Sequence, residues 1–171
     1  MDADDVLRVI DRLRSANIRV WVDGGWGVDA LLGRQTRRHR DLDLALQLAD
    51  VEGALDVLAE LGYQVVDDEL PTRVDLRADD DRRVDLHPLT FDADGHGHQQ
   101  LQDGSFGTYT ADGLGGVGRI AGRRVDCLTP DLQMRFHLGY EPDDSDHHDV
   151  HLLAEHFDLP LPPEFQVPDR G

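Results

Sequence analysis

Residues 20–46 constrain the fold more than any other part of the chain, because they read as a strand, a glycine pair, a helix, a basic run and a second strand, in that order. Residues 18–22 form a short β-rich run, IRVWV, which Asp23, Gly24 and Gly25 interrupt. The next segment, WGVDALLG, predicts a short helix that ends at Gly33. Glycines between a strand and a helix N-terminus let a phosphate group approach the backbone amides. The order therefore indicates a phosphate-binding turn, although a plain turn is the simpler interpretation of the glycines alone.

The second strand of this segment alternates acidic and apolar residues. Successive side chains of a strand point to opposite faces, so Leu42, Leu44 and Leu46 are expected to face a core. Asp41 and Asp43 then share the other face, with Cα atoms about 6.6 Å apart. Two carboxylates at that spacing can bind one hard divalent cation such as Mg²⁺. The alternative is the solvated polar face of a half-buried strand.

A basic run stands directly before the two aspartates, although the formal net charge of the chain is −18. This run contains Arg34, Arg37, Arg38, His39 and Arg40. A metal-bound triphosphate requires carboxylates for its metal and cations for its phosphates, within a few ångströms of each other. The juxtaposition favours a nucleoside triphosphate site over a solvated loop with internal ion pairs.

A third carboxylate is expected from the segment RRVDLHP, which contains Asp85. The acidic triplet 79–81 predicts a hairpin turn between two strands. A turn centred on Asp80 places Asp75 directly opposite Asp85, and like charges that face each other in a sheet are unfavourable. A metal or a cationic substrate between them would make the pairing favourable. An exposed strand carboxylate is the alternative interpretation of Asp85.

Length and composition limit the classes of protein that remain. A chain of 171 residues is expected to form one domain, with or without a small appendage. Strong negative charge argues against nucleic acid as the main partner. No run of 18 apolar residues occurs, so no membrane span is expected. Cys127 is the single cysteine and the N-terminus is unlike a secretory signal, which together favour the cytoplasm.

The remaining segments alternate between helical and strand-like patterns. Apolar spacing predicts helices over residues 4–16 and 50–62, and a proline-initiated helix over 130–138. A last helix is expected over 149–156, whereas residues 91–104 read as a loop. Further strands are expected at residues 63–66, 72–78, 82–89, 106–111 and 118–128, the last interrupted by a turn at 121–122. The pattern predicts an α/β (α+β) domain built around one sheet, with a short helical C-terminal part.

The segment VWVDGGWGVDALLGRQTRRHRDLDLAL, residues 20–46, closely resembles the antibiotic nucleotidyltransferases of the DNA polymerase beta-like superfamily. Within them it is most similar to the small lincosamide nucleotidyltransferases and the related aminoglycoside-2''-adenylyltransferases. The resemblance covers nearly all of residues 5–155. It implies the nucleotidyltransferase fold, with a mixed central β-sheet flanked by helices. It also implies a catalytic domain over residues 1–128 and a small helical segment over 129–171 that packs on it.

The same resemblance implies roles for individual residues. Asp41, Asp43 and Asp85 would be the catalytic carboxylates and the metal ligands, and Asp85 is also a candidate base for the hydroxyl of the acceptor. Four residues would face the phosphates of the nucleotide, namely Gly24, Gly25, Arg40 and His39. The implied reaction transfers a nucleoside monophosphate, AMP from ATP by preference, to a hydroxyl of a small antibiotic, with Mg²⁺ as cofactor and pyrophosphate as leaving group. The broad superfamily has serine where this chain has Gly25, so backbone amides are expected to replace that hydroxyl.

Several alternatives stay open at this stage. The acceptor could be a protein or another metabolite, or the chain could be a non-catalytic antibiotic-binding module. A monomer and a homodimer are both compatible with the sequence. Trp21 and Trp26 fit either a stacking role or the core. His147, His148, Asp149 and His151 suggest either a zinc cluster or a solvated polar loop.

Overall fold

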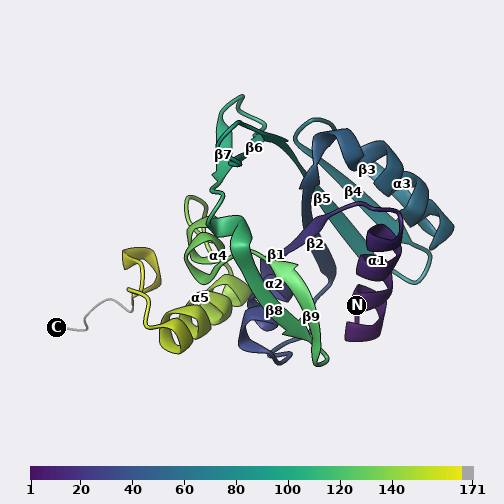
Figure 1. The fold of residues 1–171 in the computed structure, drawn as a ribbon. Coiled ribbons are helices and arrows are strands. Elements are labelled where there is room, and N and C mark those ends of the chain that lie inside the picture. Colours follow the sequence, from purple (N-terminus) through teal and green to yellow (C-terminus); the bar gives the residue numbers. More distant parts are fainter. Residues whose placement is uncertain (167–171) are drawn as a thin grey trace.

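The computed structural model describes residues 1–166, in which one mixed sheet carries helices on both sides (Figure 1). The helices are α1 (Ala3–Ser15), α2 (Gly24–Leu32), α3 (Val51–Glu60), α4 (Pro130–Phe136) and α5 (Asp144–Phe157). The strands are β1 (Val20–Asp23), β2 (Asp41–Gln47), β3 (Tyr63–Glu69), β4 (Arg73–Ala78), β5 (Arg83–Phe91), β6 (Gly97–Gln100), β7 (Phe106–Tyr109), β8 (Gly116–Ile120) and β9 (Arg123–Cys127). Short 3-10 turns at Leu48–Asp50, Gly113–Gly115 and Pro163–Phe165 complete the described chain. The α/β (α+β) class and the helix-flanked mixed sheet are confirmed.

Strand order in the sheet is β3-β4-β5-β2-β1-β9-β8, and the β6-β7 ribbon extends from β5. The pairs β2 with β5 and β1 with β9 are parallel, whereas the other pairs are antiparallel. The strand that carries the paired aspartates therefore lies in the interior of the sheet, with β1 on one side and β5 on the other. Each neighbouring strand places a carboxylate level with Asp43, namely Asp23 on β1 and Asp85 on β5.

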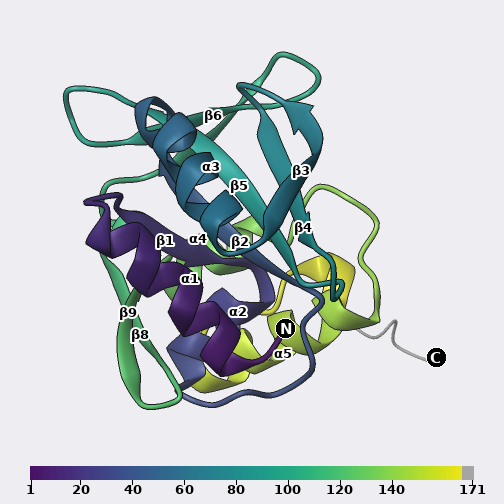
Figure 2. The ribbon, with the colours of Figure 1, turned by 90° about the vertical axis from the view of Figure 1, so that its right-hand side faces the viewer.

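The alternation in β2 produces two different faces, as the sequence predicts. Leu42, Leu44 and Leu46 are fully buried in the main core. Helices α1 and α3 cover this face of the sheet (Figure 2). The opposite face carries Asp41 and Asp43, which line a cavity.

Helix α2 is buried on nearly all sides, which fixes the position of the glycine turn at its start. Trp26 and Ala30 pack into the main core, while Val28 packs against α4 and α5. Gly24 begins the helix with a φ of +58°, and Gly33 ends it in the left-handed conformation. Glycine adopts such angles at little cost because it has no Cβ.

The hairpin of β4 and β5 has the predicted symmetric register. Asp75 pairs directly with Asp85, and Arg77 pairs with Arg83. The turn passes through Asp81, whose φ is +68°. Aspartate tolerates this conformation better than most residues. The expectation that two carboxylates face each other here is confirmed.

Two expectations about secondary structure are wrong. Residues 91–104 are not all loop, because β6 occupies Gly97–Gln100 and pairs with β5 and β7. Its sequence, GHQQ, lacks the branched residues that signal a strand, so the pairing comes from its neighbours. Helix α5 begins at Asp144 rather than at 149, because Asp143 and Asp146 form a capping box.

The C-terminal helices pack on α2 through a small apolar cluster. It contains Val28, Met134, Val150, Leu153 and Phe165. The division of the chain into residues 1–128 and 129–171 stays a prediction, and residues 167–171 of the second part lie outside the described residues. Within residues 1–166, no helix is long and apolar enough to span a membrane.

Gly118→Val tests the close approach that holds α2 against the sheet. A Cβ at Gly118 would collide with the backbone of Ala30 in α2. We therefore expect the variant to lose about 1–3 kcal/mol of unfolding free energy, as overpacked cores do. Urea unfolding measures the loss. Val117→Ala on the exposed face of the same strand is the control, and an equal loss there would contradict the packing argument.

Candidate active site

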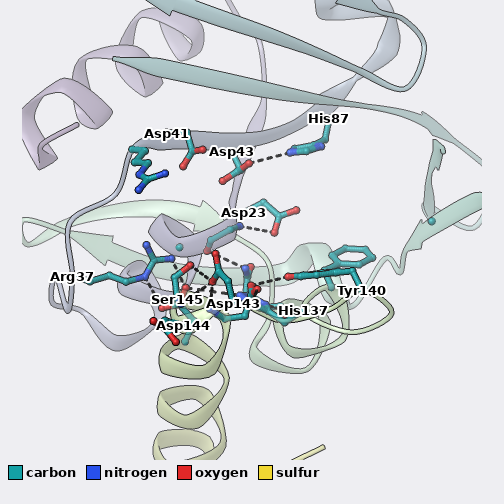
Figure 3. Close-up of a pocket in the computed structure, with 18 of the residues that line it drawn as sticks. Asp23, Arg37, Asp41, Asp43, His87, His137, Tyr140, Asp143, Asp144 and Ser145 are labelled. Atoms are coloured by element: carbon teal, nitrogen blue, oxygen red, sulfur yellow. Dashed lines mark hydrogen bonds and ion pairs between the residues drawn. The ribbon is translucent and has the colours of Figure 1, made fainter. Parts of the chain in front are cut away.

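A cavity of about 930 Å³ opens on the acidic face of β2. Figure 3 shows Asp41, Asp43 and His87 along one wall, with Asp23 near the middle. The opposite wall carries Arg37 and the residues at the start of α5. The cavity therefore separates a carboxylate wall on the sheet from a wall that the C-terminal helices build.

The parallel pairing of β2 with β5 brings two predicted carboxylates together, because Asp43 is level with Asp85. One ligand atom each from Asp43, Asp85 and His87 lies within 4.8 Å of the others, the one grouping of this kind in residues 1–166. Asp41 lies two residues along the same strand and lines the cavity, but it is not part of that close group. The structure thus places Asp41, Asp43 and Asp85 in one region, with Asp43 between the other two.

The donor set fits a divalent cation. Oδ1 of Asp85 is buried and has no hydrogen-bond partner among the described residues, while its Oδ2 lies 3.4 Å from Nη1 of Arg73. A buried carboxylate oxygen without a partner is costly, and a cation would satisfy it. Burial and the charges of Asp43 and Asp75 raise the pKa of Asp85 to about 6, against the opposing effects of His87 and Arg73. Burial and the neighbouring Asp43 likewise raise the pKa of Asp41. A bound cation would favour the ionised form of both carboxyls.

His87 belongs to the site, and the sequence reasoning missed it. Its Nε2 lies 3.3 Å from Oδ1 of Asp43, and its Nδ1 lies 3.1 Å from Nε2 of Gln99. Burial lowers the pKa of the ring, but the hydrogen bond to Asp43 and the charges of Asp43, Asp85 and Asp23 outweigh burial and raise it to about 9. The signal was present in the alternation of β5, since residues 85 and 87 share one strand face.

The glycine pair is required by the side chains around it. A Cβ on Gly24 would collide with the carboxylate of Asp43. A Cβ on Gly25 would lie 2.5 Å from Nδ1 of His39 and closer still to Nη2 of Arg37. Both glycines line the cavity. Their absent side chains therefore leave room for the residues that surround the predicted phosphate-binding turn.

The basic run divides into three residues that line the cavity and two, Arg34 and His39, that do not. Arg37, Arg38 and Arg40 line the cavity. His39 is buried, its Nε2 contacts Asp29, and its ring packs 4.7 Å from that of Trp26. Only its Nδ1 faces the glycine turn, so a contact of His39 with phosphate stays a prediction, as does that of Arg40.

The possible zinc cluster near the C-terminus does not converge on one point. His147 packs against Phe165, with ring centroids 5.0 Å apart, and Nε2 of His148 lies 3.1 Å from Oγ1 of Thr36. Asp149 pairs instead with Arg37. The two tryptophans are likewise accounted for by burial in the core.

Comparison with known proteins identifies the family. The sequence profile of the aminoglycoside-2''-adenylyltransferase family matches residues 5–153. The chain belongs to this family. Its members are nucleotidyltransferases, which take their nucleotide from a nucleoside triphosphate and in general use a divalent metal.

Individual relatives include a lincosamide resistance protein of Staphylococcus haemolyticus, 28% identical over 87% of this chain and 92% of the relative. A 2''-aminoglycoside nucleotidyltransferase of Klebsiella pneumoniae is 32% identical over 74% of this chain and 69% of the relative. Among solved structures, the lincomycin-bound lincosamide antibiotic adenylyltransferase LnuA matches with a TM-score of 0.78 and 27% identity, covering 88% of this chain and 94% of LnuA. The complex of ANT(2'')-Ia with adenylyl-2''-tobramycin matches in fold, with a TM-score of 0.69 and 21% identity over 91% of this chain and 88% of that protein.

Asp43→Asn tests the carboxylate wall. The substitution is nearly isosteric and removes one charged ligand, so we expect nucleotidyl transfer to fall roughly a hundredfold or more, since a bound metal contributes several kcal/mol of charge stabilisation. Asp41→Asn should be impaired in the same direction. Product formation at a fixed Mg²⁺ concentration measures both effects, and thermal melting checks the fold. Activity close to that of the unmodified protein in either variant would contradict its assignment as a ligand.

Proposed function

We propose that this protein transfers AMP from ATP to a hydroxyl group of an antibiotic that carries amino groups, with Mg²⁺ as the metal. The observation that carries the proposal is the alignment of Asp43 with Asp85 on parallel strands. Asp43 lines a cavity that three arginines also line, and Asp85 lies beside Asp43. Carboxylates for a metal and cations for phosphates are the two requirements of a metal-bound triphosphate. Membership of the family supports the reaction class.

In the proposed reaction, the acceptor oxygen attacks the α-phosphorus in line, a P–O bond to the acceptor forms, and the bond to pyrophosphate breaks. Asp85 receives the proton of the acceptor hydroxyl. Arg40, with Arg38 beside it on the cavity wall, holds the phosphate chain by charge-assisted hydrogen bonds. Mg²⁺ bound by Asp41, Asp43 and Asp85 would supply charge neutralisation on the phosphates.

The acceptor is proposed to be cationic because of the wall opposite the sheet. Asp143, Asp144 and Asp146 line the cavity at the start of α5. Hydrogen bonds from Ser145 and from the backbone of Asp146 lower the pKa of Asp143, which keeps it ionised. A group of carboxylates favours an amine-bearing ligand. Lincomycin is bound by one structural relative, and tobramycin is the adenylylated product in another.

We further propose that the protein acts in the cytoplasm, where ATP is abundant, as a monomer or homodimer without nucleic acid. Nucleotidylation of a protein or another metabolite is the alternative activity. A non-catalytic binding module is the less favoured alternative, because three neighbouring carboxylates have no evident use in binding alone.

Mass spectrometry of candidate acceptors tests the proposed activity. Lincomycin and tobramycin are each incubated with the protein, ATP and Mg²⁺, and one of them is expected to gain the mass of one adenylyl unit. Omission of the metal by EDTA treatment should abolish the gain. A panel with no modified antibiotic, together with a self-modified or otherwise modified protein, would favour the alternative activity.

Asp85→Asn tests the base separately from nucleotide binding. The variant should still bind Mg²⁺-ATP through Asp41 and Asp43. The rate of transfer should fall at least about 10²- to 10⁴-fold, the range for a positioned base, and further because Asp85 is also a proposed metal ligand. Single-turnover kinetics at saturating ATP measure the loss. Asp75→Asn is the matched control, because Asp75 pairs with Asp85 across the hairpin but lies outside the close ligand group. An inactive Asp75→Asn beside an active Asp85→Asn would contradict the assignment.

A further inference from the structure

Arg37 is held in a single orientation by a buried carboxylate from the far end of the chain. Its Nε lies 2.9 Å from Oδ1 of Asp149 and its Nη2 lies 2.5 Å from Oδ2, so the pair is bidentate. The side chain of Asp149 is 1% exposed, whereas that of Arg37 is 27% exposed. A planar fork of this kind fixes both position and direction of the guanidinium.

Asp149 is suited to this role because it remains charged despite its burial. Burial raises the pKa of its carboxyl, but the hydrogen bonds from Arg37 and the nearby charges of Arg37 and His137 lower it overall. Nε2 of His137 lies 3.9 Å from Oδ2 of Asp149, and its Nδ1 lies 2.8 Å from the backbone carbonyl of Gln133. Two helices, α4 and α5, therefore contribute to the anchor.

The anchored guanidinium lies over the glycine turn. A Cβ on Gly25 would overlap Nη2 of Arg37, so the arginine occupies the space into which any side chain at position 25 would project. Two of the guanidinium N–H groups bond to Asp149 and Nη1 is 3.5 Å from the carbonyl of Arg38. Guanidinium has further N–H donors, and Arg37 lines the cavity. Donors thus remain to face a ligand.

We propose that Arg37 binds the phosphate chain of the nucleotide above Gly25, and that Asp149 is a positioning residue that acts through Arg37. This inference rests on the proposed function. It makes α5 a part of the nucleotide site, although its residues lie more than a hundred positions from the glycine turn in sequence (Figure 3).

A purely structural role for Arg37 and Asp149 predicts different binding results from a role in phosphate binding. If Arg37 only connects the basic run to α5, its loss should weaken every ligand of the cavity alike. If it binds phosphate, its loss should weaken ATP and leave adenosine, which has no phosphate, unchanged. If Asp149 acts through Arg37, its substitution should have no further effect once Arg37 is replaced.

The experiment is calorimetric titration of the full-length protein with ATP and with adenosine. Arg37→Gln is expected to weaken ATP binding at least about tenfold, the size of one hydrogen bond to a charged group. Asp149→Asn should weaken ATP binding by a smaller factor, and the Arg37→Gln/Asp149→Asn double variant should match Arg37→Gln. Adenosine affinity should stay the same in all of them. The double variant also contains no unpaired buried charge, so it is the reference for folding by thermal melting.

Arg34→Gln is the matched control, because Arg34 is exposed, belongs to the same basic run and does not line the cavity. It removes the same charge and should leave ATP affinity unchanged. ATP affinity of the double variant within about twofold of the unmodified protein, or an equal loss of adenosine affinity, would overturn the inference. Failure of the unmodified protein to bind ATP would overturn it together with the proposed function. A selective loss of ATP affinity in a protein that modifies no antibiotic would support the inference and overturn only the proposed acceptor.

Discussion

The interaction on which the site depends is the anchoring of the basic run by two buried carboxylates. Asp29 of α2 accepts hydrogen bonds from the backbone and hydroxyl of Thr36, at 3.0 and 2.6 Å, and contacts His39. Asp149 of α5 holds Arg37 from the other side. A loop rich in arginine would otherwise be solvated and mobile, because long side chains lose much entropy when they are ordered. Buried ionic partners are costly to separate, so they define one arrangement of the loop.

The other half of the site is a group of carboxylates that are distant in sequence and are brought together by the register of neighbouring strands. Asp23 of β1 is level with Asp43 of β2, which is level with Asp85 of β5. Three carboxylates in adjacent strands repel each other, and burial together with the charge of Asp43 raises the pKa of Asp23. His87 offsets part of this charge at Asp43, and a hydrogen bond from Tyr109 at 3.2 Å reaches Asp23. The acidic wall is therefore stable only with such partners, and a bound cation would extend the same compensation.

Much of this arrangement could be predicted from sequence because it follows from short-range periodicity. The alternation in β2 fixed which side chains are buried, and the acidic turn fixed the pairing of Asp75 with Asp85. The β6 strand could not be predicted, since its residues have no strand preference and the ribbon it forms is supported by neighbours. The partner of Arg37 was also inaccessible, because Asp149 reads as one of several polar residues in a histidine-rich segment and meets Arg37 only through the packing of α5 on α2.

An acidic chain can bind an anion, as proposed, because charged groups affect the site only over short distances. Exposed charges are screened beyond about 8–10 Å at physiological ionic strength, so most of the net charge of −18 contributes little at the glycine turn. What matters locally is the run that contains Arg37, Arg38 and Arg40, whose side chains reach one cavity. Asp149 neutralises part of the charge of Arg37, but it leaves donors of the guanidinium facing the cavity. Asp149 thus weakens the attraction of Arg37 for an anion but fixes the orientation of its guanidinium. The remaining donors are therefore already oriented when a ligand binds.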